Sequence, residues 1–334
     1  MKAGCLAQAG SSNGFFRPHP WLAGGHRQTL LGFWCRRFLR WTLPAEDLVV
    51  DAGDDVRLLL RATWQPGRRA DRAALVVVHG LGGCDTSPYV VSTGRLAFAR
   101  GWHVVRMNMR GAGDGEALCP RLYNAGLDTD LLAAVEAVAR ATPRVAVAGF
   151  SLGAGQALLA LGRLQDRLPQ ALRGAAAVSP ALDLSACADA LARPENRLYQ
   201  RYFMDGLREA YRRRARRRPD LFQAGRERGT RTVRDYDEAV TAYYGGYRGA
   251  ADYYERSSAG PWLAAIDRPA LILAAADDPM IPSDSVVRWP IAPAVRREVA
   301  ATGGHVGFVG GSPAPGFFCA PPRLLDFLEE AVRA

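Results

Sequence analysis

The chain has 334 residues, of which 49% are hydrophobic and 23% are charged. This composition is typical of a globular protein and excludes a disordered chain, and the length suffices for one large α/β domain or a domain with an inserted cap. The formal net charge is +10, carried almost wholly by arginine, because Lys2 is the only lysine. No apolar run approaches the roughly 18 to 20 residues that span a bilayer, and the N-terminus lacks the apolar core of a signal peptide.

The six cysteines are scattered along the chain, without a CxxC pair or a histidine-rich partner segment. They are Cys5, Cys35, Cys84, Cys119, Cys187 and Cys319. This spacing suggests neither a zinc site nor a disulfide framework, so we expect no metal. A reducing, cytoplasmic location fits this cysteine usage best.

In chain order, residues 1–45 are expected to form a turn-rich N-terminal arm that contains FRPHPWLAGGHRQTL. A β-hairpin follows over 48–64, with its turn at 52–55. From residue 74 onward, apolar strands alternate with amphipathic helices. The expected strands are 74–80, 102–108, 145–150, 174–180 and 270–276, and the expected helices are 87–101, 126–141, 153–167 and 322–334.

Alternation of strands that are apolar on both sides with helices predicts an α/β fold with a mostly parallel central sheet flanked by helices. The alternation breaks between about 184 and 262, a stretch rich in Arg, Tyr and acidic residues without a strand-like run. We interpret this stretch as a helical lid inserted above the strand ends, where open α/β sheets bind their ligands. The expected organisation is an arm over 1–45, a core over 46–183 and 263–334, and a lid over 184–262.

The segment VAVAGFSLGA (145–154) passes from an apolar, β-branched run into a helix-forming stretch. Its Gly-Phe-Ser-Leu-Gly places Ser151 at a tight strand-to-helix turn, the nucleophile elbow of serine hydrolases. Gly149 and Gly153 leave room for the sharp turn and for the helix beneath it. The hydroxyl of Ser151 is then exposed above the sheet, and the start of the helix faces any oxyanion that forms there.

A serine hydroxyl needs a neighbouring base to attack an ester. Of the five histidines, only His305 follows Ser151, and it lies in the glycine-rich loop ATGGHVGFVGG. We therefore expect His305 to take the serine proton and later to protonate the leaving group.

An acidic residue should orient that histidine, and Asp278 ends the strand ALILAAADD. Asp277 is adjacent and stays open, although neighbouring side chains on an extended segment point in opposite directions, so that only one should face the histidine. We favour Asp278, which is followed by a loop fixed by two prolines. Asp183, after the preceding strand, is a weaker alternative.

The oxyanion requires two backbone N–H donors. One should come from Leu152, the residue after the nucleophile, and the other from Leu81, in the loop after His79. The glycines of His79-Gly-Leu-Gly-Gly suit such a close backbone approach. His79 itself is interpreted as a structural loop residue. Because HGLGG lacks the G-x-G-x-x-G of a dinucleotide site, no organic cofactor is expected.

Three further polar residues are less informative. Asn108 and Arg110, in MNMRGAGDGE, end a strand and are expected to brace the oxyanion loop. His26, in GGHRQTL, receives no chemical role from the sequence.

The segment YRRRARRRPD (211–220) is the most basic run of the chain. Its simplest interpretation is a solvated helix face, and attraction of Arg212–Arg218 to an anionic membrane surface or substrate is the alternative. No aromatic residues interleave the arginines as a base-stacking surface would require, so no nucleic-acid partner is expected.

Several segments together resemble those of a known family. They are FRPHPWLAGGHRQTL, VVVHGLGGCDTSPYV, MNMRGAGDGE, GFSLGAG, DYDEAVTAYYGGYRGAADYYERSSA, ADDPMIP and GGHVGFVGG, and they extend from about residue 16 to 311. The chain thereby resembles the α/β-hydrolase superfamily and, within it, the YheT-like branch known as the AB hydrolase 4 family. HRQTL and DYYERSSA are more specific for this branch than GFSLG is. One departure is Ala154, where many relatives have a second glycine after the elbow.

The resemblance implies an α/β-hydrolase fold and carboxylic ester hydrolysis by a Ser-Asp-His relay on Ser151, Asp278 and His305. Known relatives include esterases, phospholipases and acyltransferases, so the resemblance does not fix a substrate. We expect a cytoplasmic serine esterase that cleaves a small to medium-chain acyl ester or a lipid through an acyl-enzyme. The alternatives are an acyltransferase with an alcohol acceptor, or a non-catalytic membrane-surface binding protein on the same fold, against which the intact relay argues.

Overall fold

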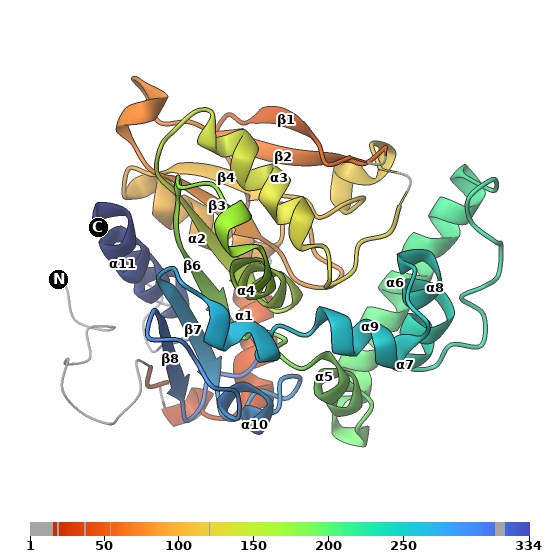
Figure 1. Cartoon of the computed structure of the whole chain (residues 1–334). Helices are drawn as coiled ribbons and strands as arrows, with labels where there is room; N and C mark the ends of the chain where they lie inside the picture. Colours follow the sequence, from red (N-terminus) through yellow and green to blue (C-terminus); the bar gives the residue numbers. More distant parts are fainter. Residues whose placement is uncertain (1–15, 19, 37, 54, 120, 311–317) are drawn as a thin grey trace.

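The computed structural model describes residues 16–18, 20–36, 38–53, 55–119, 121–310 and 318–334 (Figure 1). An eight-stranded sheet runs through the molecule in the order β1-β2-β4-β3-β5-β6-β7-β8. The strands are β1 (Glu46–Asp51), β2 (Arg57–Thr63), β3 (Ala74–Val78), β4 (His103–Met107), β5 (Val145–Phe150), β6 (Leu172–Val178), β7 (Ala270–Ala275) and β8 (Val295–Ala300). β1 pairs with β2 and β2 with β4 in antiparallel fashion, and every other pair is parallel. The predicted α/β fold with a mostly parallel sheet is confirmed.

Helices cover both faces of this sheet. They are α2 (Pro88–Ala99) and α11 (Ala320–Arg333) on one face, and α3 (Asp128–Ala139) and α4 (Leu152–Leu164) on the other. Successive residues of a strand serve opposite layers: in β3, Leu75 belongs to the same buried cluster as α11, and Val76 to that of α3 and α4. A strand covered on both sides is apolar at every position, which explains why the sequence reveals the central strands so clearly.

Some regular elements lie where the sequence predicted none, among them a helix in the arm and an edge strand. The arm contains a twelve-residue helix, α1 (Gly25–Arg36), although its composition favours turns. The strand β8 closes the sheet beside β7, and its sequence, VRREVA, carries three charged residues in six. An edge strand has only one neighbour and tolerates charged side chains, so the apolar signal of the central strands is absent there.

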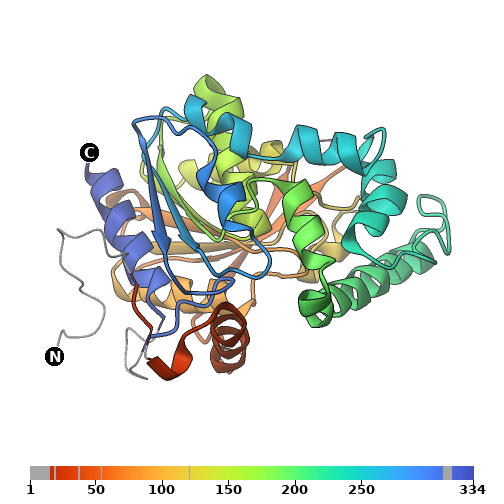
Figure 2. The same ribbon diagram turned by 90° about the horizontal axis from the view of Figure 1, so that it is seen from below.

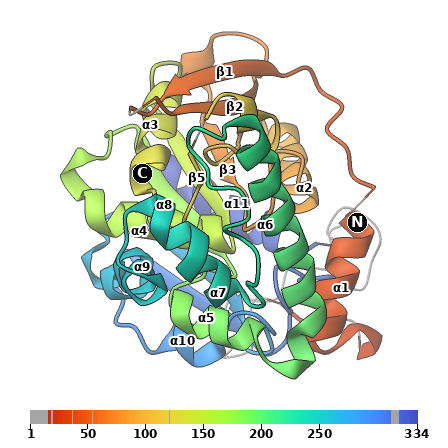
Figure 3. The same ribbon diagram turned by 90° about the vertical axis from the view of Figure 1, so that its right-hand side faces the viewer.

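The chain between β6 and β7 is helical. It contains α5 (Leu184–Leu191), α6 (Arg197–Arg217), α7 (Val233–Tyr236), α8 (Ala242–Gly245) and α9 (Ala250–Ser257), and residues 184–262, all of them described, include no strand. These helices gather on one side of the molecule (Figures 1 and 3). Buried residues of α5, α8 and α9 belong to the same core cluster as the sheet, α3 and α4. Residues of α6 and α7 form a second cluster that includes Met280, from the loop after β7 that also carries α10 (Ser283–Val287). The insertion therefore packs onto the sheet domain. None of the helices in the described ranges combines the length and the apolarity that a membrane crossing requires.

The cysteines differ in one respect from the expectation. Cys84, Cys119 and Cys187 have free thiols, but Cys319 is disulfide-bonded. Cysteine spacing alone does not reveal such a pairing. Cys5 lies outside the described residues.

Candidate active site

Ser151 alone makes the turn between strand and helix, because β5 ends at Phe150 and α4 begins at Leu152. Its φ of 54° and ψ of −117° are strained values for a residue with a side chain, and such values persist only where the surroundings enforce them. A Cβ on Gly149 would lie 2.5 Å from the carbonyl oxygen of Gly153, and a Cβ on Gly153 would collide with the carbonyl oxygen of His79. The two glycines are therefore needed for the backbone to turn so sharply beneath the serine.

Three side chains from distant parts of the sequence meet at this turn. The Nε2 atom of His305 lies 2.9 Å from Ser151 Oγ, and its Nδ1 atom lies 2.9 Å from Asp278 Oδ2. With the carboxylate at Nδ1, the ring carries its proton there and offers the Nε2 lone pair to the serine hydroxyl. The other carboxylate oxygen of Asp278 accepts the N–H groups of Met280 (2.9 Å) and Ile281 (3.0 Å), so the side chain is fixed at both ends.

The two alternative aspartates, Asp277 and Asp183, have partners other than the ring of His305. Asp277 points to the backbone of the histidine loop: its Oδ1 accepts the N–H groups of Gly303 (2.9 Å) and Gly304 (3.0 Å), and its Oδ2 accepts the hydroxyl of Thr302 (2.5 Å). Asp183 caps the N-terminus of α5 by accepting the N–H of Ala186, and it also pairs with Arg288. Of the three aspartates considered from the sequence, Asp278 is the one that contacts the His305 ring.

Most backbone N–H groups of the glycine-rich loop after β3 donate hydrogen bonds within the protein. The N–H groups of four residues are donated within the protein: Gly80 to the Tyr89 hydroxyl (2.9 Å), Gly82 to the Tyr123 hydroxyl (2.8 Å), Gly83 to the Gly80 carbonyl (3.1 Å) and Cys84 to the Ser87 hydroxyl (2.9 Å). Within residues 80–84, all of them described, only the N–H of Leu81 has no acceptor. Leu152 is the first residue of α4, so its N–H also has no acceptor within the helix. The sequence did not indicate these two tyrosines, which hold the loop from α2 and from the chain before α3 (Asp128–Ala139).

His79, Asn108 and Arg110 support the site rather than face it. His79 is fully buried, and burial lowers its pKa to about 4. The neutral ring fits its contacts, since Nδ1–H donates to the Gly80 carbonyl (2.8 Å) and Nε2 accepts the N–H of Met109 (3.1 Å). Asn108 accepts the N–H of Asp85 (2.9 Å) and so braces the end of the loop. Arg110 pairs with Asp130 of α3, and its bracing of the oxyanion loop stays a prediction.

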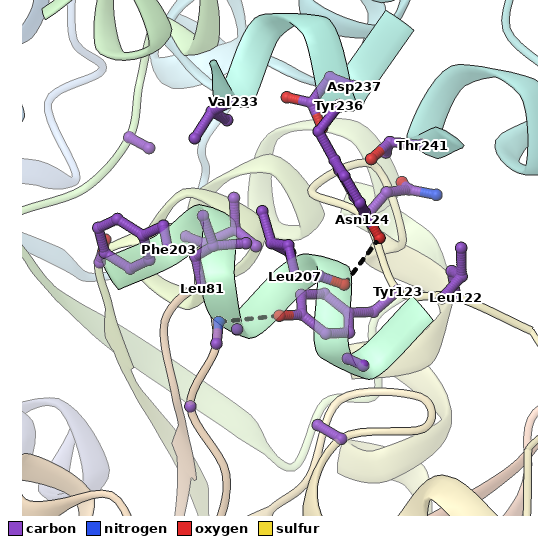
Figure 4. Close-up of a pocket in the computed structure, with 18 of the residues that line it drawn as sticks. Leu81, Leu122, Tyr123, Asn124, Phe203, Leu207, Val233, Tyr236, Asp237 and Thr241 are labelled. Atoms are coloured by element: carbon purple, nitrogen blue, oxygen red, sulfur yellow. Dashed lines mark hydrogen bonds between the residues drawn. The ribbon is translucent and has the colours of Figure 1, made fainter. Parts of the chain in front are cut away.

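A cavity of about 350 Å³ opens beside the serine. Figure 4 shows residues that line this cavity. Ser151, His305, Leu81 and Leu152 line it at the end of the sheet. Its remaining wall is mostly apolar and comes largely from the inserted helices; it includes Leu122, Leu184, Leu191, Phe203, Leu207, Val233 and Met280. Pockets of this size and character hold small organic ligands with a few polar groups to orient them.

The arginines of the basic run have partners inside the protein. Arg212 pairs with Glu227 at 2.9 Å, Arg213 and Arg217 pair with Glu116, and Arg218 pairs with Asp220. Arg214 is buried and donates to the carbonyl oxygens of Gly111, Cys119 and Arg121. Much of this run therefore joins α6 to the sheet domain, and its association with an anionic membrane surface stays a prediction.

Asp237, another residue that the sequence analysis missed, lines the cavity from the insertion (Figure 4). Burial raises the pKa of its carboxyl to about 6, and the hydrogen bonds from Thr241 and from the Tyr254 hydroxyl (2.7 Å) oppose that rise only in part. The folded protein thus holds a proton on this carboxyl between about pH 3.8 and pH 6, where the unfolded chain has released it. The corresponding stabilisation is complete below pH 3.8 and is lost as the pH rises through 6.

We expect Asp237→Asn to raise the free energy of unfolding by about 1–3 kcal/mol at pH 8 and to change it little at pH 4. The amide keeps an acceptor for Tyr254 but carries no charge, so the cost of burying a carboxylate disappears. Urea unfolding of both proteins at the two pH values measures the difference. Equal stabilisation at pH 4 and pH 8 would contradict the assignment to ionisation.

The chain is similar in sequence to a known family and to several known proteins. Residues 73–312 match the family model described as the alpha/beta hydrolase fold. The chain is 32% identical over 333 residues to YheT of Escherichia coli (strain K12), provisionally named an esterase, covering 97% of this chain and 96% of YheT. It is 29% identical over 248 residues to the mouse protein named phospholipase ABHD3, covering 72% of this chain and 59% of that protein.

Solved structures share the fold at low sequence identity. The Pyrococcus furiosus esterase Pf2001 superimposes with a TM-score of 0.57 at 15% identity, over 87% of this chain and 96% of the esterase. A structure described as a membrane phospholipase A superimposes with a TM-score of 0.55 at 18% identity, over 92% of this chain and 93% of that one. At these identities the likeness concerns the fold alone.

Proposed function

Since the chain belongs to the α/β-hydrolase family, in its YheT-like branch, and is a carboxylesterase-type hydrolase, we propose that it cleaves small to medium-chain acyl esters through an acyl-enzyme on Ser151. The observation that carries this proposal is the pair of 2.9 Å contacts that link Asp278 to His305 and His305 to Ser151. An isolated serine hydroxyl attacks esters poorly, and this arrangement supplies a base and orients it.

In the first half-reaction, Ser151 Oγ attacks the ester carbonyl while His305 Nε2 takes the hydroxyl proton. The carbonyl oxygen becomes an oxyanion, and the N–H groups of Leu81 and Leu152 stabilise it. Collapse of the tetrahedral intermediate breaks the bond to the alcohol oxygen, which receives the proton from His305 and leaves. Asp278 stabilises the imidazolium that exists between these two transfers.

In the second half-reaction, water takes the place of the alcohol. His305 removes a proton from the water as the water oxygen attacks the acyl carbonyl on Ser151. The second tetrahedral intermediate expels the serine oxygen, which recovers its proton from His305. The products are a carboxylic acid and the free enzyme.

The inserted helices would determine which esters enter. We propose that residues 184–262 form a lid over a core of 46–183 and 263–334, with 1–45 as an arm, because side chains from α5, α6, α7 and α9 line the cavity that contains Ser151. The apolar wall suits an acyl chain. The names of relatives, which include esterases and phospholipases, favour ester or lipid substrates.

An acyltransferase would share the acyl-enzyme and differ only in the acceptor, so it remains the alternative. A cytoplasmic location stays a prediction. A purely binding role gives no reason for a serine, a histidine and an aspartate to meet in one cavity.

The proposal is tested by hydrolysis of p-nitrophenyl esters that range from acetate to palmitate, together with labelling by a fluorophosphonate. We expect turnover on the shorter and medium esters, a decline toward palmitate, and complete inactivation when one phosphonyl group is found on the peptide that contains Ser151. Full turnover after stoichiometric labelling of Ser151 would overturn the proposal. Addition of an alcohol to the same assay tests the alternative, because a transferase forms the new ester in preference to the acid.

A further inference from the structure

Helix α1, which the sequence analysis assigned to a turn-rich arm, packs directly against the loop that carries His305. Figure 2 shows α1, in red, beside the blue C-terminal part of the chain. The segment HRQTL, singled out in the sequence without a chemical role, forms the first turns of this helix. Two of its polar side chains, Gln28 and Thr29, are buried rather than exposed.

Thr29 contacts the backbone of His305 itself. Its hydroxyl oxygen accepts the N–H of His305 at 2.8 Å and donates its own proton to the Gly25 carbonyl at 2.7 Å. The hydroxyl therefore donates within α1 and accepts from the loop. The second of these bonds holds the backbone of His305 itself, so it acts on the orientation of the ring.

Gln28 holds the same loop four residues later. Its side-chain oxygen accepts the N–H of Val309 at 2.7 Å, and its side-chain nitrogen donates to the Val309 carbonyl at 3.1 Å and to the Leu22 carbonyl at 2.8 Å. The amide thus binds both polar backbone groups of Val309, as a neighbouring strand would. Gln28 is fully buried, so water cannot replace these bonds.

The loop needs such support, because it contains strained residues. Val306 has a φ of 55° and Phe308 a φ of 44°, in the left-handed region that β-branched and bulky residues rarely adopt. Such conformations cost about 1–3 kcal/mol each and persist only when surrounding contacts enforce them. The fit with α1 is also close: a Cβ on Gly304 would lie 2.7 Å from the Thr29 hydroxyl oxygen.

From these contacts we infer that Thr29 and Gln28 are positioning residues for the reaction, which hold the strained His305 loop so that the ring reaches both Ser151 and Asp278. Helix α1 is in this sense part of the active site. Neither residue lines the cavity, and neither touches the reacting atoms. The inference rests on the proposed function, since positioning matters only if His305 is the base.

The test compares Thr29→Val, which removes the hydroxyl at nearly constant volume, with Thr29→Ser, which keeps it. We expect Thr29→Val to lower kcat by about 10- to 100-fold with KM within about twofold, because small displacements of a catalytic group have effects of this order. Thr29→Ser should recover most of the lost kcat. Hydrogen exchange at the amides of 303–309 should be faster in Thr29→Val, since the His305 N–H loses its acceptor.

Thr142→Val is the matched control. Thr142 is equally buried and donates to the Arg72 carbonyl at 2.6 Å, but it precedes β5 at the opposite end of that strand from Ser151. It should lose comparable stability and keep its kcat and its exchange over 303–309. Should Thr29→Val not fold, Gln28→Met probes the same loop at Val309 with the same readouts.

The inference is overturned if Thr29→Val matches Thr142→Val in kcat and leaves exchange over 303–309 unchanged, or if Thr29→Ser is as impaired as Thr29→Val. Failure of the proposed function gives a different pattern: Ser151→Ala would then retain the wild-type turnover. The hydrogen-exchange measurement does not depend on turnover. It therefore shows whether Thr29 holds the His305 loop even if the proposed function is wrong.

Discussion

Ser151→Ala is expected to lower kcat for ester hydrolysis by at least about 10⁴-fold and up to about 10⁶-fold, with little change in stability. The methyl group leaves no nucleophile, and His305 and Asp278 then have no proton to transfer. The residual rate should come from the amides of Leu81 and Leu152 and from the cavity, which still bind the ester. Replacement of Ser151 also leaves no site for an acyl group, so no covalent intermediate should be detected by mass spectrometry.

Ser92→Ala serves as the control for this substitution. Ser92 lies in α2 and donates to the Tyr89 carbonyl at 3.0 Å, outside the cavity. Its loss should leave kcat within about twofold of the wild type, because surface-side helix substitutions have small effects. Comparable turnover in Ser151→Ala and Ser92→Ala would show that another group carries the reaction.

The central strands could be predicted because their physical environment leaves a simple trace in the sequence. β3, β5 and β7 are buried at every position, between helices on both faces, so each reads as a continuous apolar run. β8 lacks that trace. Within it, Arg297 donates to the carbonyl oxygens of Val286 and Trp289, and Glu298 pairs with Arg323, so its polar side chains are held by contacts that only the folded chain creates.

Helix α1 was missed for a different reason. Apolar side chains of this helix are exposed and polar side chains are buried, which is the reverse of the usual amphipathic pattern. Leu30 and Phe33 are 52% and 55% exposed, whereas Gln28 is completely buried and Thr29 nearly so. Rules that place apolar residues inside and polar residues outside fail for such a helix. The buried polar side chains are explained by their partners on the His305 loop, about 280 residues later in the chain, and no local pattern indicates those partners.

The order of the candidate nucleophile, acid and base could be read from the chain, but the geometry around them could not. The choice between Asp277 and Asp278 depended on which side chain faces His305, which sequence alternation limits without deciding. The proposal that the Leu81 amide binds the oxyanion is supported by the way in which its neighbours donate to Tyr89 and Tyr123. Those tyrosines come from α2 and from the loop before α3, so only the fold brings them to this loop.

Asp278→Asn should be nearly as damaging as the loss of the nucleophile, lowering kcat by about 10⁴-fold. The reason lies in the partners of the carboxylate. Its Oδ1 accepts two backbone N–H groups, from Met280 and Ile281, and only an oxygen can occupy that position. The amide NH₂ of asparagine must then face His305 Nδ1 and donate to it, so the ring proton moves to Nε2. In that tautomer, His305 cannot accept the proton of Ser151.

Asp277→Asn is the matched comparison, at the adjacent position and with the same change of atoms. Here the asparagine oxygen can keep the N–H bonds of Gly303 and Gly304, and its NH₂ can donate to the Thr302 hydroxyl, which accepts as readily as it donates. No contact of this side chain reaches the ring of His305, so kcat should fall by less than about tenfold. Kinetics of both variants on one p-nitrophenyl ester decide the matter. Equal losses would mean that the carboxylates act only by holding the loop, whereas a difference of about 10³-fold would assign the orientation of the imidazole to Asp278.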